Sequence, residues 1–163
     1  MEHAPGGVAV NGFLLDMPRS FEDFATVALG EELPRRGGQA RRQDPHHLDV
    51  GHEVRIRPDL VWRVAGAPAA VLDAKYKAKK PSGFPDADLY QMLAYCTVLR
   101  LERGHLVYAK GNERPAHYVV RHSGIQIICH ALDLGRPPYE LLAQTRALGQ
   151  QVAEAAGARG VRA

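Results

Sequence analysis

The segment AVLDAKYKAKK, residues 70–80, begins as an apolar run and then places Asp73 and Lys75 two positions apart. Side chains alternate between the two faces of a β-strand, so Asp73 and Lys75 are expected on one face and Ala74 on the other. A carboxylate and an ammonium group side by side can act together on a charged substrate. The alternative is an ordinary solvated pair at the end of a strand, which contributes little.

A second carboxylate, Asp59, closes the triplet RPD. The segments 53–64 and 69–77 predict two strands, and the turn sequence AGAP between them predicts an antiparallel hairpin that brings Asp59 near Asp73. Two close carboxylates repel each other, and each has a raised pKa unless a cation lies between them. Mg²⁺ suits this position because it favours oxygen ligands, keeps several waters and binds substrate phosphates, and Mn²⁺ is expected to substitute for it.

Lys75 would lie beside such a metal ion. A lysine there can hold the attacking water and stabilise the negative charge that develops on phosphorus in the transition state. The combination predicts hydrolysis of a phosphodiester bond. Further along, Lys77, Lys79 and Lys80 are expected to hold the DNA backbone next to the site.

A second group of basic residues lies in a glycine-containing segment. Its members are Arg35, Arg36, Arg41 and Arg42. The formal net charge of the chain is only +3, from 21 basic and 18 acidic residues. This mild excess permits a nucleic-acid partner without requiring one, so the clustering carries more information than the sum.

The length of 163 residues, with 45% hydrophobic and 24% charged residues, predicts one globular domain over 1–163 with an N-terminal extension at 1–12. No segment is long and apolar enough to span a membrane, and the N-terminus does not resemble a secretory signal. Cys96 and Cys129 both lie in apolar segments, so we expect reduced core cysteines in a cytoplasmic protein without a membrane partner.

The elements that must position these side chains follow from hydrophobic periodicity and turn residues. They are a helix at 17–29, a long exposed loop at 34–52, the hairpin at 53–77, a helix at 87–104, strands at 105–111, 116–122 and 125–134, and a helix at 138–158. Pro58 interrupts the first hairpin strand and predicts an edge, a bulge or a bend. The order predicts an α/β or α+β fold, with helices packed around one mixed sheet.

Two details of the helices are testable. The apolar face of the first helix is expected to contain Phe21, Phe24, Val27 and Ala28. The second helix is expected to begin with a cap from Asp86 or Asp88 and to end at Gly104.

Four motifs, in the order FEDF, RPDLV, VLDAKYK and DLYQMLAYC, resemble the nuclease domain of McrC, the cleavage subunit of McrBC-type modification-dependent restriction systems. More broadly, RPD followed by VLDAKYK resembles the PD-(D/E)xK nuclease superfamily, which has the restriction-endonuclease-like fold. The resemblance covers roughly residues 12–134. It implies a metal-dependent DNA endonuclease of a restriction or phage-defence system. It also implies a partner of the McrB kind, an AAA+ GTPase or ATPase.

The resemblance also implies roles for single residues. Asp59 and Asp73 match the metal carboxylates, and Lys75 matches the catalytic lysine. Glu22 matches an acidic residue that many of these nucleases contribute to the metal site from the first helix. Gln91 and Tyr95 match the Q-x-x-x-Y element of the RecB-like branch. Their spacing of four residues places both on one face of a helix.

Other functions remain open from the residues alone. The chain could be a binding module that holds DNA or a nucleotide-hydrolysing partner without cutting, or a RecB-like repair nuclease. The segment DPHHLDVGHE, residues 44–53, offers histidine and carboxylate side chains that could bind zinc or manganese, although no closed ligand spacing is present. One active site cuts one strand, so a double-strand break requires a homodimer or a partner that pairs two copies.

Overall fold

The computed structural model describes residues 7–10, 13–76, 84–109 and 115–157, and side chains from Asp16 onward within them. A six-stranded sheet forms its centre, in the order β3-β6-β7-β8-β10-β9. Its strands are β3 (Gln39–Arg42), β6 (Leu60–Val64), β7 (Ala67–Lys75), β8 (Arg103–Ala109), β9 (Ala116–Val119) and β10 (Gln126–Leu132). The pairs β7–β8 and β8–β10 are parallel and the others antiparallel, so the sheet is mixed as predicted.

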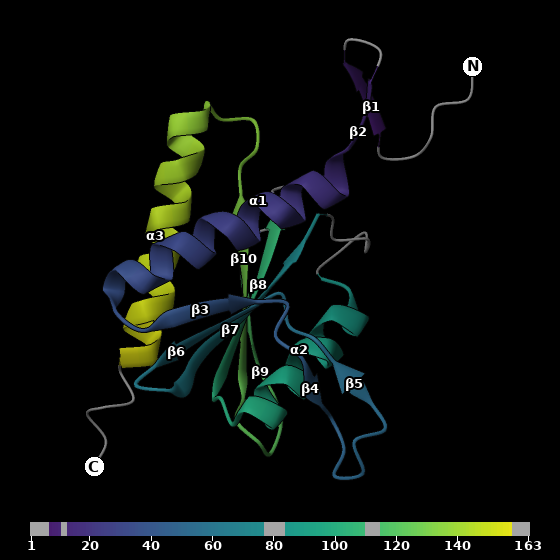
Figure 1. The fold of residues 1–163 in the computed structure, drawn as a ribbon, viewed down its shortest axis with the longest axis vertical. Helices are drawn as coiled ribbons and strands as arrows, with labels where there is room; N and C mark the ends of the chain where they lie inside the picture. The colour runs from purple at the N-terminus through teal and green to yellow at the C-terminus, as the bar shows by residue number, and fades with distance from the viewer. Residues whose placement is uncertain (1–6, 11–12, 77–83, 110–114, 158–163) are drawn as a thin grey trace.

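Helices cover both faces of this sheet (Figure 1). The helices α1 (Met17–Glu32) and α3 (Pro138–Gly157) contact each other and one face, whereas α2 (Asp86–Leu99) packs against the other. A short 3₁₀ helix, η1 (Leu33–Arg36), follows α1. Two small hairpins lie outside the sheet, β1 (Gly7–Val10) with β2 (Phe13–Asp16) and β4 (His46–His47) with β5 (Arg55–Ile56). The predicted fold class is confirmed.

The β6–β7 hairpin sets the register of the future site. Ala65 and Gly66 both have positive φ values, 51° and 80°, which is the conformation of a tight two-residue turn. The register pairs Leu60 with Leu72. The residues that follow outward from this pair are Asp59 and Asp73, so the predicted hairpin does bring the two carboxylates together.

The first helix begins where Asp16 Oδ1 accepts a hydrogen bond from Arg19 N–H at 3.2 Å, with Pro18 in the first turn. Its buried side chains include Phe21, Ala25 and Leu29, which follow one another at intervals of four. The prediction for the apolar face of α1 is therefore only partly correct, since Phe21 is buried but Val27 is not. Val27 is 40% exposed, because the sheet contacts a narrower stripe of the helix than its apolar residues define.

The helix α2 starts within one residue of the predicted position, but the predicted side-chain cap and the predicted end at Gly104 are wrong. The helix begins after Pro85 without a side-chain cap, and it ends at Arg100, which adopts a left-handed conformation with φ 54°. Gly104 lies inside β8 instead. A Cβ atom there would meet the side chains of Met92 and Cys96, so a glycine lets α2 lie close to the sheet.

The long loop predicted at 34–52 is also wrong in part. Residues 39–42 form the edge strand β3, which pairs antiparallel with β6, and His46–His47 pairs with β5. The segment shows no alternation because only Ala40 of β3 turns toward the core. Charged side chains are common at a sheet edge because they discourage pairing with other chains. Because this composition lacks the usual hydrophobic alternation of a strand, the sequence did not predict β3.

The cysteines agree with the expectation of reduced core residues. Cys96 and Cys129 are buried and free of disulfide bonds. In the part of the chain that the structure describes, no helix combines the length and the apolar character needed to cross a membrane.

Candidate active site

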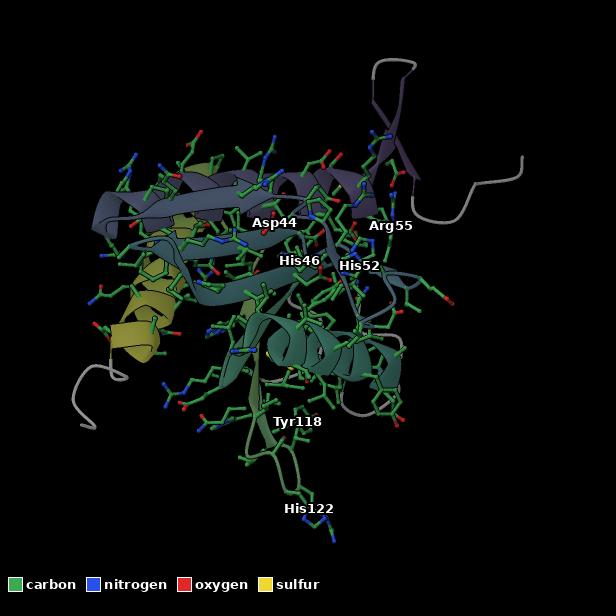
Figure 2. All side chains as sticks on the ribbon, turned by 60° about the horizontal axis from the view of Figure 1, so that its bottom comes forward. Asp44, His46, His52, Arg55, Tyr118 and His122 are labelled. Atoms are coloured by element: carbon green, nitrogen blue, oxygen red, sulfur yellow. The ribbon has the colours of Figure 1, made fainter. Side chains whose placement is uncertain are left out.

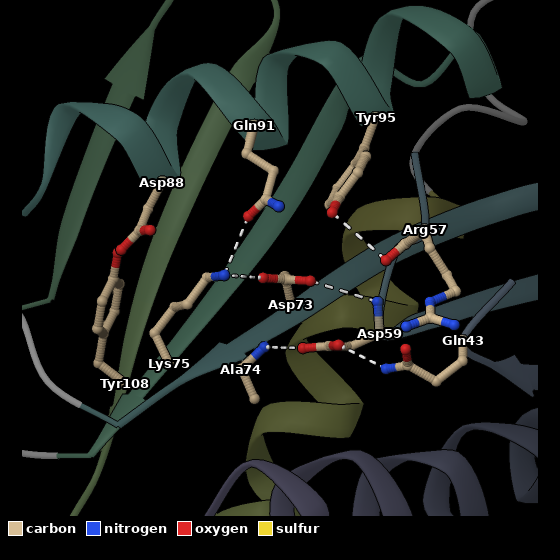
Figure 3. Close-up of polar contacts among 10 residues, drawn as sticks. All are labelled: Gln43, Arg57, Asp59, Asp73, Ala74, Lys75, Asp88, Gln91, Tyr95 and Tyr108. Carbon is tan, nitrogen blue, oxygen red and sulfur yellow. Dashed lines mark hydrogen bonds and ion pairs between the residues drawn. The ribbon is translucent and has the colours of Figure 1, made fainter. Parts of the chain in front are cut away.

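The carboxylates of Asp59 and Asp73 lie side by side, and each accepts a hydrogen bond from a backbone N–H of the other's segment (Figure 3). The Asp59 N–H donates to Asp73 Oδ1 at 3.3 Å, and the Ala74 N–H donates to Asp59 Oδ2 at 3.0 Å. The contacts follow from the register of the β6–β7 hairpin, which pairs Leu60 with Leu72, while Pro58 lies in the short segment between β5 and β6. Sequence analysis expected this pair, and the structure brings it together.

Asp73 is the buried member of the pair, with 3% of its surface exposed. Desolvation, and next the negative charge of Asp59, raise the pKa of Asp73 from 3.8 to about 7, although Lys75 acts in the opposite direction. Its Oδ2 lies 2.8 Å from Lys75 Nζ, an ion-pair distance. The Lys75 ammonium group is thus the partner of this buried oxygen, and its charge and hydrogen bond lower the pKa of Asp73.

Lys75 points from β7 between Asp73 and helix α2. Besides its ion pair, its Nζ donates a hydrogen bond to Gln91 Oε1 at 3.0 Å. Burial acts to lower the pKa of Lys75, but the carboxylates of Asp73, Asp88 and Asp59 outweigh it and raise that pKa. The ammonium group is therefore charged and fixed in direction by two acceptors. The expected face of α2 that carries Gln91 does turn toward Lys75.

Gln43 is a site residue that sequence analysis missed. Its Nε2 donates to Asp59 Oδ1 at 2.7 Å, so both oxygens of Asp59 are held by the protein. Its backbone N–H donates to the Asp59 carbonyl at 2.9 Å. Gln43 has a φ of 51°, a conformation that non-glycine residues rarely adopt. No local pattern announces this contact, because it depends on the pairing of β3 with β6.

The neighbour of Gln43, Asp44, anchors this segment. Asp44 is 2% exposed, and its carboxylate lies 2.7 Å from Arg63, 2.9 Å from His46 and 3.3 Å from Arg41. Burial acts to raise the pKa of Asp44, but hydrogen bonds from Arg63 and His46 outweigh it and lower that pKa. A charged, fully paired carboxylate thus holds the start of β4 in place beside the candidate site.

Two tyrosines border the site without entering it. Tyr108 OH donates to Asp88 Oδ2 at 2.8 Å, which places a third acidic residue near Lys75. Tyr95 OH donates to the Arg57 carbonyl at 3.4 Å and is 2% exposed. Tyr95 was expected to contact DNA, but a side chain so deeply buried supports the chain just before Asp59 instead.

Glu22 lies on the first helix and faces the same region. It lines a pocket of about 440 Å³ together with Lys75, Tyr76 and Asp88, among others. Desolvation, and next the charge of Asp59, raise the pKa of Glu22, whereas Lys75 lowers it. Glu22 is therefore close enough for the charges of Asp59 and Lys75 to shift its pKa. It does not complete a metal cluster, since no group of three or more histidine, cysteine or acidic side chains suited to a metal occurs in the described part.

The residues present fit a magnesium ion better than a softer metal. The donors are carboxylate oxygens of Asp59 and Asp73, and the charge of Asp59 raises the pKa of Asp73, so a bound cation would relieve the repulsion between them. Mg²⁺ is commonly held by one or two carboxylates while waters and substrate phosphates complete its shell. Two carboxylates are sufficient for this mode of binding.

The expected basic groups divide into two sets. Arg35 and Arg36 lie near the carboxylate of Glu32, at 4.0 and 2.9 Å, and Arg41 is paired with Asp44. Arg42 lies exposed on the edge strand β3. The remaining candidates, Lys77, Lys79 and Lys80, lie outside the described residues.

The histidine-rich segment does not form a metal site among the residues described. His46 is the partner of Asp44, and the His47 ring stacks on that of His52 with centroids 4.6 Å apart. Both arrangements belong to the β4–β5 hairpin, which they help to order. The alternative of a zinc or manganese site here is not supported.

Fold and site together define a mixed α/β domain whose central hairpin presents two adjacent carboxylates and a lysine at the surface of the sheet. The family described as McrBC 5-methylcytosine restriction system component matches residues 1–109 of the chain. The chain belongs to this family. The expected relationship to McrBC-type restriction systems is thereby confirmed.

A solved assembly shows the same fold. A chain in the refined half-complex of Thermococcus gammatolerans McrB AAA+ hexamers with bound McrC is similar with a TM-score of 0.67 and 18% sequence identity. The match covers 86% of this chain and 34% of that chain, so the present chain spans about a third of its length. No curated protein sequence matches the chain significantly.

Proposed function

We propose that this domain is a magnesium-dependent DNA endonuclease of the McrC type, acting in a restriction or phage-defence system. The observation that carries the proposal is the arrangement of Asp59, Asp73 and Lys75. The buried carboxylate of Asp73 lies beside that of Asp59, and the Lys75 ammonium group lies 2.8 Å from Asp73 Oδ2. Desolvation and the charge of Asp59 raise the pKa of Asp73, and a bound cation would relieve this repulsion.

Asp59 and Asp73 would hold the metal ion. A bound Mg²⁺ would supply Lewis-acid stabilisation of a phosphate oxygen and would lower the pKa of a coordinated water. Lys75 would orient the attacking water and bind the phosphate as negative charge develops. Gln91 fixes Lys75 Nζ, and Gln43 fixes Asp59 Oδ1, so neither group needs to reorganise when substrate binds. The leaving O3′ oxygen takes its proton from solvent.

A partner and a second copy belong to the proposal. The similar solved assembly contains McrC bound to McrB AAA+ hexamers, and this chain is proposed to work with a nucleotide-hydrolysing ring of the same kind. A double-strand break would require two copies of the site, either as a homodimer or paired by that ring. The substrate would be intracellular DNA, in keeping with a cytoplasmic protein.

Nicking of supercoiled plasmid tests the proposal directly. The purified chain is incubated with Mg²⁺ or Mn²⁺, with EDTA and Lys75→Ala as controls, and with duplex and single-stranded substrates in parallel. Cleavage that needs metal and is lost in Lys75→Ala is the expected result. Preference for single strands would favour a RecB-like repair nuclease. A folded protein that binds no metal and cuts nothing would favour a non-cleaving binding module.

A further inference from the structure

The β4–β5 hairpin is an ordered projection beside the candidate site. Its strands pair His46 with Ile56 and His47 with Arg55, and Leu48 N–H donates to the Val54 carbonyl at 2.8 Å. At the turn, the carboxylate of Asp49 accepts hydrogen bonds from the backbone of Glu53 and Val54. The projection is thus built by specific contacts, and Figure 2 shows it extending away from the sheet near His52 and Arg55.

Both ends of the hairpin are fixed to the candidate site. On the entering side, Gln43 and Asp44 donate their N–H groups to the carbonyls of Asp59 and Pro58, at 2.9 and 3.1 Å. On the leaving side, the Arg57 carbonyl accepts from Tyr95. A polymer that lies across Asp59 therefore passes close to the hairpin.

The strand β5 turns its charged side chains outward. Ile56 packs against the core beneath α2, so its neighbours Arg55 and Arg57 face away from the core, and both are exposed. Arg57 and Arg55 lie two and four residues before Asp59 in the sequence, so both are close to this carboxylate along the chain.

These two arginines differ from the basic residues that the sequence suggested. Arg35, Arg36 and Arg41 each have a carboxylate nearby, which lowers their attraction for phosphate. Among the residues that the structure describes, neither Arg55 nor Arg57 forms an ion pair. The hairpin and the residue that follows it therefore carry two arginines without an ion pair close to Asp59 in sequence, and Arg42 of β3, which pairs with Leu60 in the sheet, is a third exposed arginine in this region.

The tip of the hairpin is apolar. Val50 is fully exposed, and Leu48 and Val54 are 46% and 48% exposed, although the turn itself is ordered. Proteins that grip duplex DNA often combine arginines on the phosphates with aliphatic side chains in a groove or between base steps. The hairpin presents both features on one rigid element.

We propose that the β4–β5 hairpin is the DNA-binding element of this domain. Arg55 and Arg57 bind phosphates that flank the scissile position, and Leu48 and Val50 enter a groove. The proposal rests on the proposed nuclease function for its substrate, but it concerns binding and not cleavage. It is therefore testable in EDTA, where failure of the cleavage chemistry leaves the result unchanged.

The experiment measures binding of a fluorescent DNA duplex by anisotropy, in EDTA, over a range of salt concentrations. The double variant Arg55→Gln with Arg57→Gln is compared with Arg121→Gln, an exposed arginine of the β9–β10 turn, next to His122 at the far end of the domain in Figure 2. Each phosphate contact contributes about 0.9 to the slope of log Kd against log salt. The double variant should lose about 2 from this slope and weaken binding by well over tenfold at 100 mM salt.

A tip variant, Leu48→Ser with Val50→Ser, should weaken binding severalfold without changing the slope, because no charge is removed. Thermal unfolding confirms that each variant is folded, which is expected since all four side chains are exposed. Equal slopes for the double variant and Arg121→Gln would overturn the proposal. So would a tip variant that binds DNA normally but loses association with an AAA+ ring, because the hairpin would then be a protein-docking element.

Discussion

Replacing Asp73 by asparagine should stabilise the metal-free protein at pH 8 and change its stability much less at pH 5. The folded-state pKa of Asp73 is raised from 3.8 to about 7, chiefly by desolvation and by Asp59. A group whose pKa rises on folding contributes stability that is fully present below its unfolded pKa. That contribution is lost as the pH rises through its folded pKa. Asparagine has the same shape and no charge, so it avoids this loss.

The magnitude follows from the size of the shift. One pKa unit corresponds to about 1.4 kcal/mol, so the shift of Asp73 amounts to roughly 4 kcal/mol once the group is fully ionised. Part of this is already present at pH 5, where the unfolded chain has lost its proton. The stability advantage of Asp73→Asn should therefore grow by about 2–3 kcal/mol between pH 5 and pH 8. This magnitude already includes the ion pair with Lys75, because that pair contributes to the pKa of about 7.

Urea unfolding at pH 5, 6, 7 and 8 measures the difference between the two proteins, in buffers that contain EDTA. Asp23→Asn, an exposed carboxylate on α1, serves as the matched control and should show no such trend. A difference that stays constant across this range would show that Asp73 ionises at an ordinary pKa. The argument for a strained carboxylate pair that awaits a cation would then be refuted.

Three further results are expected. Gln43→Ala should lower metal affinity or cleavage by about 10–100-fold while leaving the unfolding temperature nearly unchanged, because it releases Asp59 Oδ1 without opening the core. The buried His105 and the half-buried His130, with ring nitrogens 3.0 Å apart, should make the protein sensitive to acid. Burial lowers the pKa of His105 to about 3 and that of His130 to about 4, so stability should be full above pH 6.5 and fall by several kcal/mol toward pH 4. Gly104→Ala should cost about 1–3 kcal/mol, measured by urea unfolding, since its Cβ would lie 2.6 Å from Cys96 Sγ.

Each of these results has a control. Gln39→Ala, on the exposed part of β3, should leave metal affinity intact, and an equal loss there would attribute the effect to the edge strand as a whole. A variant with asparagine at both 105 and 130 should lose most of the acid sensitivity. Gly66→Ala, where a Cβ meets nothing within 4 Å, separates the strain of a positive φ from the crowding expected at Gly104.

Much of the site followed from local sequence. The alternation of a strand places Asp73 and Lys75 on one face, and the turn at Ala65 and Gly66 makes a hairpin that carries Asp59 to Asp73. The family resemblance, together with the helical spacing of Gln91, predicted a face of α2 turned toward the site, and Gln91 does accept a hydrogen bond from Lys75. These inferences succeeded because each depends on side-chain direction within one element, or within two elements joined by a short turn.

Other parts of the site lay beyond local pattern. Gln43 reaches Asp59 only because β3 pairs with β6, and β3 itself was hidden by its charged, edge-strand composition. Asp88 and Tyr108 meet across the packing of α2 on β8. Tyr95 has the right spacing for a site residue, yet tertiary packing buries it.

By itself, the sequence determined the helices and most strands, the central hairpin and the carboxylate–lysine group at its end. These depend on periodicity and on turn residues over a few positions of the chain. Tertiary structure decided which charges are free to act. Arg41 is paired with Asp44, whereas Arg55 and Arg57 form no ion pair within the part of the chain that the structure describes. The reason is physical, because ion pairing and desolvation depend on distances between segments that only the folded chain brings together.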